Sequence, residues 1–173
     1  MERWQQVEEC LRVRLPEKAR GVKIRLHGDL HLGQLLMTGD DFCILDFEGE
    51  PNRPLAERRA KDTTLKDVAG MIRSFDYAAR VTLCAQAPAS FARGRFAFAQ
   101  WEHLTTRTFL ASYREILGTS LLWPRKDAAR LLSLLILEKA LYEVIYEATH
   151  RPAWLHIPLA GLHNLACGRY YQT

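Results

Sequence analysis

The segment HGDLHLGQLLMTGDDFCILDFEG, residues 27–49, decides the fold of this 173-residue chain. Apolar residues fill Leu35–Met37 and again Phe42–Leu45, and the turn-forming stretch Thr38–Asp41 lies between them. Two short apolar runs around such a turn predict a β-hairpin. Just upstream, residues 23–26 alternate polar and apolar side chains, which predicts a short strand that leads into the segment.

The polar residues of this segment are spaced as in the functional loops of protein kinases. Asp29 follows the first strand, Gln34 comes five residues later, and Asp46 stands 17 residues after Asp29. Protein kinases carry H-R-D-x-x-x-x-N and then D-F-G, and this chain has H-G-D-x-x-x-x-Q and then D-F-E-G. Phosphoryl transfer needs one carboxylate that faces the acceptor hydroxyl, a task that suits Asp29. Gln34, Asp46 and Glu48 offer the oxygen ligands that Mg²⁺ prefers, and His27 is expected to brace the loop.

Three stretches of the chain, IRLHGDLHLGQ, DFEGEPNRPLAERRAKDTTLKDVAGMIRSFDYAA and ILEKALYEVIYEATHRPAWLHIPLAGL, resemble maltokinases. These enzymes belong to the aminoglycoside-phosphotransferase-like branch of the kinase fold. The resemblance covers nearly the whole chain and implies one domain over residues 1–173, a protein-kinase-like C-terminal lobe that is mainly α with a small β-hairpin. Within it we expect a catalytic loop at 27–34, a metal loop at 46–49 and an acceptor-binding helix at 127–149.

The same resemblance implies an activity and its cofactors. The reaction would be ATP-dependent phosphorylation of maltose to maltose 1-phosphate, with ATP and Mg²⁺ as cofactors. Asp29 would be the catalytic base, and Gln34, Asp46 and Glu48 would hold the metal. Maltose or a related sugar is therefore an expected partner. Trehalose synthase, to which maltokinases are often fused, is another.

The nucleotide-binding lobe of a kinase has no counterpart in this sequence. The chain begins just before the catalytic loop, and it contains no G-x-G-x-x-G, no P-loop and no V-A-I-K-like strand. We therefore expect the N-terminal nucleotide-binding lobe to be missing and half of the ATP cleft to come from elsewhere. A truncated, non-catalytic lobe that binds sugar or a partner chain is accordingly the main alternative.

A polar stripe on the expected helix at 127–149 supports a sugar acceptor. Glu138, Lys139, Tyr142 and Tyr146 are three or four residues apart, so they share one face of a helix. Carboxylate and ammonium groups bind sugar hydroxyls, and tyrosine rings cover the apolar face of a pyranose. The maltokinase resemblance places its acceptor region here too. Tyr142 and Tyr146 are equally compatible with ordinary packing of a buried helix.

Further helices are predicted on both sides of this segment. An amphipathic helix is expected over residues 4–15, a long loop over 47–63, and helices at about 95–117 and 127–149, with irregular chain between Pro152 and Pro158. Thr64-Leu65-Lys66-Asp67 has the form of a capping box, which predicts a helix from Leu65 onward. Asp67 is then either a capping acid or, as in kinase-like folds, a brace for the catalytic loop. Trp101, Leu104 and Tyr113 are expected to face the core.

Composition excludes several other classes of protein. Hydrophobic residues make up 48% and charged residues 25%, the mixture of an ordinary globular domain. The net charge of +4 is too small for a nucleic-acid-binding signature, and the most apolar stretch, Leu131–Leu137, is too short to cross a membrane. Four scattered cysteines and an acidic N-terminus predict a cytoplasmic location and a reducing environment.

Two more alternatives remain open from the sequence. His27 and His31 could ligate a transition metal in a hydrolase, although no third His or Cys lies nearby. A kinase with another small hydroxyl acceptor, such as an amino sugar or choline, would carry the same catalytic and metal loops.

Overall fold

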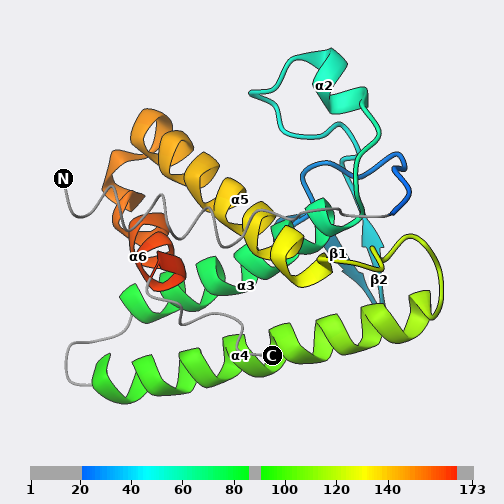
Figure 1. Ribbon diagram of the computed structural model, residues 1–173. Coiled ribbons are helices and arrows are strands. Elements are labelled where there is room, and N and C mark those ends of the chain that lie inside the picture. The colour runs from blue at the N-terminus through cyan, green and yellow to red at the C-terminus, as the bar shows by residue number, and fades with distance from the viewer. Residues whose placement is uncertain (1–20, 86–90, 167–173) are drawn as a thin grey trace.

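The computed structural model describes residues 21–85 and 91–166, and in this part of the chain helices dominate over one two-stranded antiparallel sheet (Figure 1). Helix α3 packs against both α4 and α5, and α5 packs in turn against α6. The elements, in chain order, are η1 (Leu32–Gln34), β1 (Leu35–Thr38), β2 (Asp41–Ile44), α2 (Leu55–Arg59), α3 (Leu65–Cys84), α4 (Phe91–Leu117), α5 (Ala128–His150), η3 (Pro152–Trp154) and α6 (His156–Ala166).

The core lies between α3 and α5. Buried apolar residues recur on α3 at helical spacing, and a matching set on α5 follows a spacing of four, so one apolar stripe of each helix meets the other. Phe75 of α3 adds an edge-to-face contact with Phe109 of α4, their ring centroids 5.7 Å apart. The buried cluster consists of Leu65, Val68, Ala69, Ile72, Leu132, Ile136, Ala140 and Leu165.

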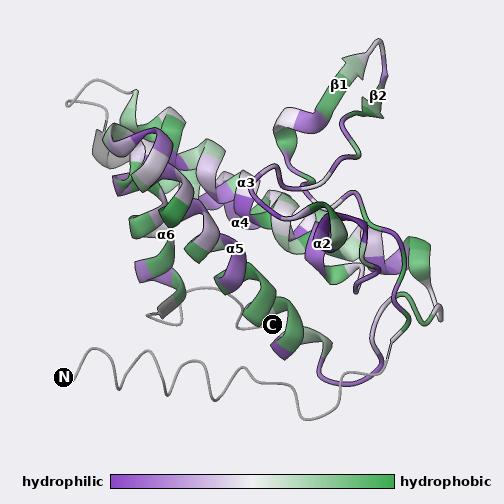
Figure 2. Cartoon of the chain, turned by 90° about the horizontal axis from the view of Figure 1, so that it is seen from above, coloured by the Kyte–Doolittle hydropathy of each residue, from purple (hydrophilic) through white to green (hydrophobic). Residues whose placement is uncertain are grey.

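The predicted hairpin is present in the expected register. Leu35 pairs with Ile44 and Thr38 with Asp41, and the chain reverses at Gly39, whose φ of +64° suits glycine. Figure 2 shows the hairpin projecting away from the helices, and nearly all of its residues are exposed. It therefore contributes little to the core and serves to connect Gln34 with Asp46.

The helical predictions are confirmed in outline, with several differences. Helix α5 agrees within one residue at each end, and α4 begins at Phe91, upstream of the expected start. The loop at 47–63 contains the short α2. The stretch between Pro152 and Pro158, expected to be irregular, forms η3 and the first turn of α6, where proline is tolerated. The expected helix at 4–15 lies outside the described residues.

Other local predictions were wrong for identifiable reasons. Residues 23–26 form no strand, because Ile24 makes only an isolated bridge to Asp62. Thr64 does not cap α3, since its hydroxyl donates to the Leu122 carbonyl at 2.5 Å instead. Trp101 and Leu104 are 43% and 56% exposed, so they do not face the core. Tyr113 does pack against it.

Candidate active site

The loop that carries Asp29 is fixed to α3 by its backbone. The amides of His27 and Gly28 donate to the two carboxylate oxygens of Asp67, each at 2.9 Å. The buried ring of His27 lies with Nε2 2.6 Å from the Leu45 carbonyl, so this nitrogen is a donor, and its Nδ1 accepts from the Asp29 amide at 3.3 Å. The Leu45 end of the hairpin is thereby tied to the Asp29 loop.

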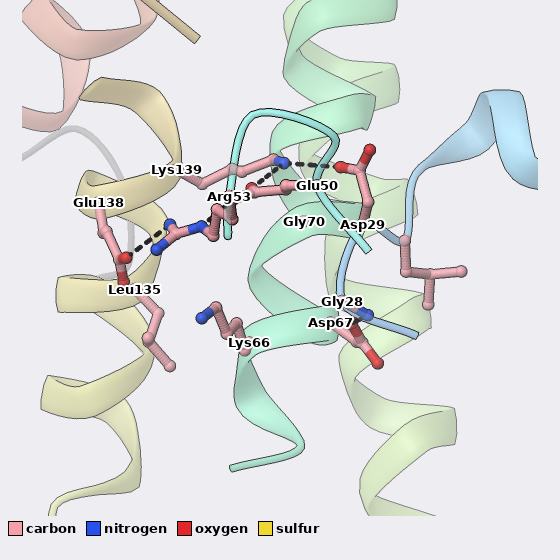
Figure 3. Close-up of a pocket in the computed structure, with 11 residues that line it drawn as sticks. Gly28, Asp29, Glu50, Arg53, Lys66, Asp67, Gly70, Leu135, Glu138 and Lys139 are labelled. Atoms are coloured by element: carbon pink, nitrogen blue, oxygen red, sulfur yellow. Dashed lines mark hydrogen bonds and ion pairs between the residues drawn. The ribbon is translucent and has the colours of Figure 1, made fainter. Parts of the chain in front are cut away.

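Asp29 itself contacts a lysine from α5. Lys139 Nζ lies 2.9 Å from Asp29 Oδ1 and 2.6 Å from Oε1 of Glu50 (Figure 3). Burial by itself would lower the pKa of Lys139, but the carboxylates of Asp29 and Glu50 raise it, so the lysine stays charged. The sequence pointed to Asp29 and Lys139 separately and gave no sign of their contact.

Glu50 and Arg53 connect the metal loop with α5. Arg53 contacts Glu50 Oε2 through Nε and donates to Glu138 Oε1 at 3.0 Å. Together with Lys139 these residues surround a small polar cavity of about 20 Å³, seen in Figure 3. Glu138, expected to bind sugar, is thus engaged by Arg53 at this cavity. It is absent from the larger cleft on the other side of Lys139.

The expected metal ligands are only partly assembled. Gln34 Nε2 donates to Asp46 Oδ2 at 3.1 Å, and Asp46 adopts φ +61°, a conformation that non-glycine residues seldom use outside special sites. The Glu48 side chain is 81% exposed and lies 3.9 Å from Arg58. Within residues 21–85 and 91–166, no three His, Cys, Asp or Glu side chains form a group that could hold a metal. The donor pair fits a Mg²⁺ ion that takes its other oxygens from water and phosphates.

His31 lies beside Asp29, with its Nε2 4.0 Å from Asp29 Oδ2. Burial lowers the pKa of His31, although the charge of Asp29 acts in the opposite direction. Its Nδ1 accepts from the Gly33 amide at 3.0 Å. Because His27 uses both ring nitrogens within the chain, the two histidines do not form a pair of metal ligands, and the metallohydrolase alternative loses its basis.

A cleft of about 640 Å³ opens next to Asp29 between α3 and α5. Tyr142 and Tyr146 are stacked along one wall with ring centroids 6.3 Å apart, and Tyr77 is stacked on Trp154 at 6.4 Å. The volume lies in the range of small-molecule sites, and aromatic walls with a few polar groups are typical of them. Tyr142 and Tyr146, but not Glu138, therefore line the space in which an acceptor could sit.

The far part of the cleft contains two glutamates that the sequence reading missed. Glu143 accepts from Arg73 at 2.6 Å, and burial raises the pKa of Glu143 while Arg73 opposes the rise. Glu147 Oε1 accepts from Tyr77 at 2.8 Å and from Arg151 at 2.5 Å, whereas its buried Oε2 has no partner among the described residues. Helical spacing from Lys139 could have indicated both glutamates, since they lie four and eight residues further along α5.

Tyr77, Arg151 and Trp154 reach the cleft from outside the α5 stripe, and no local pattern indicated them. Among the described residues, no helix is long and apolar enough to span a membrane.

Compared with models of known protein families, the chain matches none. Two characterised relatives are glucosamine kinases. That of Streptacidiphilus jiangxiensis is 32% identical over 147 residues, which cover 82% of this chain and 31% of the relative. That of Mycolicibacterium smegmatis is 37% identical over 140 residues, which cover 80% of this chain and 33% of the relative. These homologues are sugar kinases, and the chain spans about a third of their length.

Solved structures give the same result. A glucosamine kinase in complex with glucosamine, ADP and inorganic phosphate has a TM-score of 0.71 and 32% identity, covering 85% of this chain and 36% of that one. A further glucosamine kinase structure, crystal form A, has a TM-score of 0.74 and 31% identity, covering 85% of this chain and 35% of that one. The similarity supports a kinase-like fold and a sugar kinase. It does not support the expected maltose specificity in particular.

Proposed function

We propose that the chain forms the acceptor-binding and metal-binding part of an ATP-dependent sugar kinase whose acceptor is an amino sugar of the glucosamine type. The main support is the position of Asp29. Asp29 lines the aromatic cleft and stands on a loop that Asp67 holds against α3. A hydroxyl bound in the cleft would thus meet a carboxylate fixed in place before the substrate arrives.

In the proposed reaction the acceptor hydroxyl attacks the γ-phosphorus of ATP. A bond forms between the hydroxyl oxygen and phosphorus, while the bond from phosphorus to the β–γ bridging oxygen breaks and ADP leaves. Asp29 accepts the hydroxyl proton. Oδ1 of Asp29 is held by Lys139, so Oδ2 is the oxygen available for this proton.

Gln34, Asp46 and Glu48 are the residues that would hold Mg²⁺. The Gln34–Asp46 contact supports the first two, and Glu48 would have to turn from its exposed position near Arg58. When bound, the ion screens the negative charge of the nucleotide phosphates. His27 and Asp67 would keep the Asp29 loop and the Asp46 end of the hairpin in register through their hydrogen bonds.

The charge of the cleft favours an amino sugar. Arg73 pairs with Glu143 and Lys139 with Asp29, whereas Oε2 of Glu147 has no partner among the described residues. An ammonium group on the acceptor would supply a charged donor for this oxygen. Tyr142 and Tyr146 would cover the C–H face of the sugar ring.

Maltose is a second candidate, because a cleft of about 640 Å³ has room for more than one sugar ring. Choline fits the acidic lining but would leave much of the cleft unfilled. A non-catalytic lobe would bind the same sugars without consuming ATP.

The test uses the 173-residue chain joined to a kinase nucleotide-binding lobe, with MgATP and, in separate reactions, glucosamine, maltose and choline. ADP release and ³¹P NMR of the product are measured for the wild type, for Asp29→Asn and for Asp40→Asn, an exposed aspartate in the hairpin turn. We expect glucosamine phosphate from the wild type and Asp40→Asn, and at least a 100-fold lower rate from Asp29→Asn. Sugar binding without ADP release would instead show a non-catalytic lobe. A preference for maltose would overturn the amino-sugar acceptor.

A further inference from the structure

Lys139 is enclosed by charged and aromatic groups on three sides. Its ammonium contacts Asp29 Oδ1 at 2.9 Å and Glu50 Oε1 at 2.6 Å (Figure 3). The ammonium also lies 4.8 Å from the ring centroid of Tyr142. A lysine has three N–H donors. Two are used by carboxylates and the Tyr142 ring lies beside the ammonium, so Lys139 is engaged by groups of the chain itself before any sugar binds.

Glu50 holds the lysine from the side away from the acceptor. It is only 3% exposed, and it lines the small polar cavity but not the large cleft. Its second oxygen is contacted by Arg53, so cations restrain both carboxylate oxygens. A buried carboxylate restrained in this way is a fixed anchor for Lys139.

We propose that Lys139 and Glu50 form a positioning pair for Asp29. Glu50 fixes the ammonium, the ammonium fixes Asp29 Oδ1, and Oδ2 is left facing the acceptor hydroxyl. Lys139 therefore acts on turnover through Asp29 and does not bind the sugar. This inference rests on the proposed kinase function and assigns within it a role to Glu50, which lies outside both sequence motifs.

A sugar ligand and a positioning residue respond differently to substitution. Lys139→Met should lower kcat about 100-fold, because a displaced reacting group loses about that much. The dissociation constant for glucosamine, measured by calorimetry without nucleotide, should stay within about twofold of the wild type. Lys139→Arg should restore part of kcat, since it keeps a cation beside Asp29. Lys66→Met is the matched control, because Lys66 lines the same small cavity but pairs with Asp62 at 3.5 Å.

The double variant Lys139→Met/Glu50→Gln separates positioning from a purely structural role. Lys139→Met alone leaves Glu50 buried with only Arg53 as a cationic partner, so its thermal midpoint should fall. Removing the negative charge of Glu50 as well should restore much of that stability. A positioning pair predicts that kcat remains low in the double variant. Recovery of kcat together with stability would overturn the proposal, as would loss of glucosamine binding in folded Lys139→Met.

Failure of the proposed kinase function can be distinguished from failure of the positioning pair. If the wild-type chain joined to a nucleotide-binding lobe turns over no sugar, the proposed kinase function fails. The positioning pair is then tested by the ¹³C resonance of the Asp29 carboxyl carbon. Lys139→Met and Glu50→Gln should both shift this resonance and Lys66→Met should not. An unchanged resonance in Glu50→Gln would overturn the pair.

Discussion

Gly70 of α3 lies directly against the backbone of Leu30, the residue after Asp29. A Cβ atom at position 70 would stand 2.5 Å from the Leu30 carbonyl oxygen, closer than any side chain permits. Glycine inside a helix is less favourable than alanine by about 1 kcal/mol, so its use here reflects the close approach of the loop. The position of Asp29 therefore depends on the absence of a side chain on the helix beneath it.

Gly70→Ala should displace the Asp29 loop while leaving the helices intact. The added methyl group forces the Leu30 carbonyl outward, and a shift of about 1 Å at a reacting group lowers turnover by about 100-fold. Far-UV circular dichroism should be unchanged. Gly118→Ala is the control, because a Cβ there meets only the Glu115 carbonyl, at 4.0 Å, although its φ of +53° makes the substitution strained. Wild-type turnover in Gly70→Ala would show that the loop adapts without consequence.

Asp67 offers a second test of how the loop is held. Asp67→Asn leaves a single acceptor oxygen for the two backbone amides of His27 and Gly28. One of these amides then faces the NH₂ group of the asparagine, which cannot accept its hydrogen bond. Hydrogen bonds to a charged group are each worth about 1.5–3 kcal/mol, so urea unfolding should show a loss of about 2 kcal/mol. Hydrogen exchange at the His27 and Gly28 amides should accelerate. Asp41→Asn, which affects only an exposed contact with the Phe42 amide, should change stability by less than about 0.5 kcal/mol. Equal stability of both variants would contradict the bracing role.

Local patterns were sufficient for the hairpin and for the long helices. The turn at Thr38–Asp41 and the spacing of Asp29, Gln34 and Asp46 follow from short-range rules, and so does the apolar periodicity of α3 and α5. Thr64 shows where such rules fail. Its capping pattern is real in the sequence, but the Leu122 carbonyl, 58 residues away, takes its hydroxyl.

The composition of the site depended on tertiary contacts that no local pattern encodes. Glu50 directly follows the D-F-E-G motif, and no local pattern indicated its contact with Lys139 of α5. Tyr77 and Trp154 meet only because α3 and the segment after α5 converge. Glu138 was expected in the cleft, yet Arg53 draws it toward the opposite side of Lys139.

Glu102 on α4 predicts a pH dependence of stability. Burial raises the pKa of Glu102 to about 7, and the nearby charge of Asp76 adds to the rise. The folded state keeps this proton up to about pH 7, whereas the unfolded chain releases it near the ordinary value of 4.5. The folded state thus binds more protons in this window, and the free energy of unfolding falls as the pH rises through it.

Glu102→Gln should remove this decrease in the free energy of unfolding with rising pH. At pH 8 the variant should be more stable than the wild type by about 1–2 kcal/mol after allowance for solvent screening, and at pH 4 the two should be equal. Urea titrations at pH 4, 6 and 8 measure the difference. Glu115→Gln, an exposed position on the same helix, serves as the control. Parallel curves for the wild type and Glu102→Gln would rule out the raised pKa.

Arg73 connects the core with the cleft and should be needed for folding. Its side chain is 2% exposed and contacts Asp76 at 2.8 Å and Glu143 at 2.6 Å. Arg73→Met leaves those carboxylates without this buried cation, which typically lowers stability by about 3–5 kcal/mol. Arg130→Met, which removes a 52% exposed side chain 4.0 Å from Asp127, should lower stability by less than about 0.5 kcal/mol. Chemical unfolding distinguishes the two, and similar losses would mean that the Arg73 network contributes little.

The hairpin should make the chain associate. Met37 and Phe42 are cross-strand partners that are 71% and 53% exposed, and cross-strand partners share one face of a hairpin. Exposed apolar patches of this kind promote association, and a two-stranded hairpin is only marginally stable by itself. Sedimentation velocity should show a sedimentation coefficient that rises with protein concentration for the wild type.

The double variant Met37→Lys/Phe42→Glu should abolish this association, because it replaces the apolar pair with opposite charges that still interact across the strands. Ile116→Lys is the control, since Ile116 is 85% exposed near the end of α4 and lies outside the hairpin. If Ile116→Lys abolishes association and the hairpin variant does not, α4 rather than the hairpin carries the contact. A wild-type sedimentation coefficient that is independent of concentration would show that the exposed hairpin does not cause self-association.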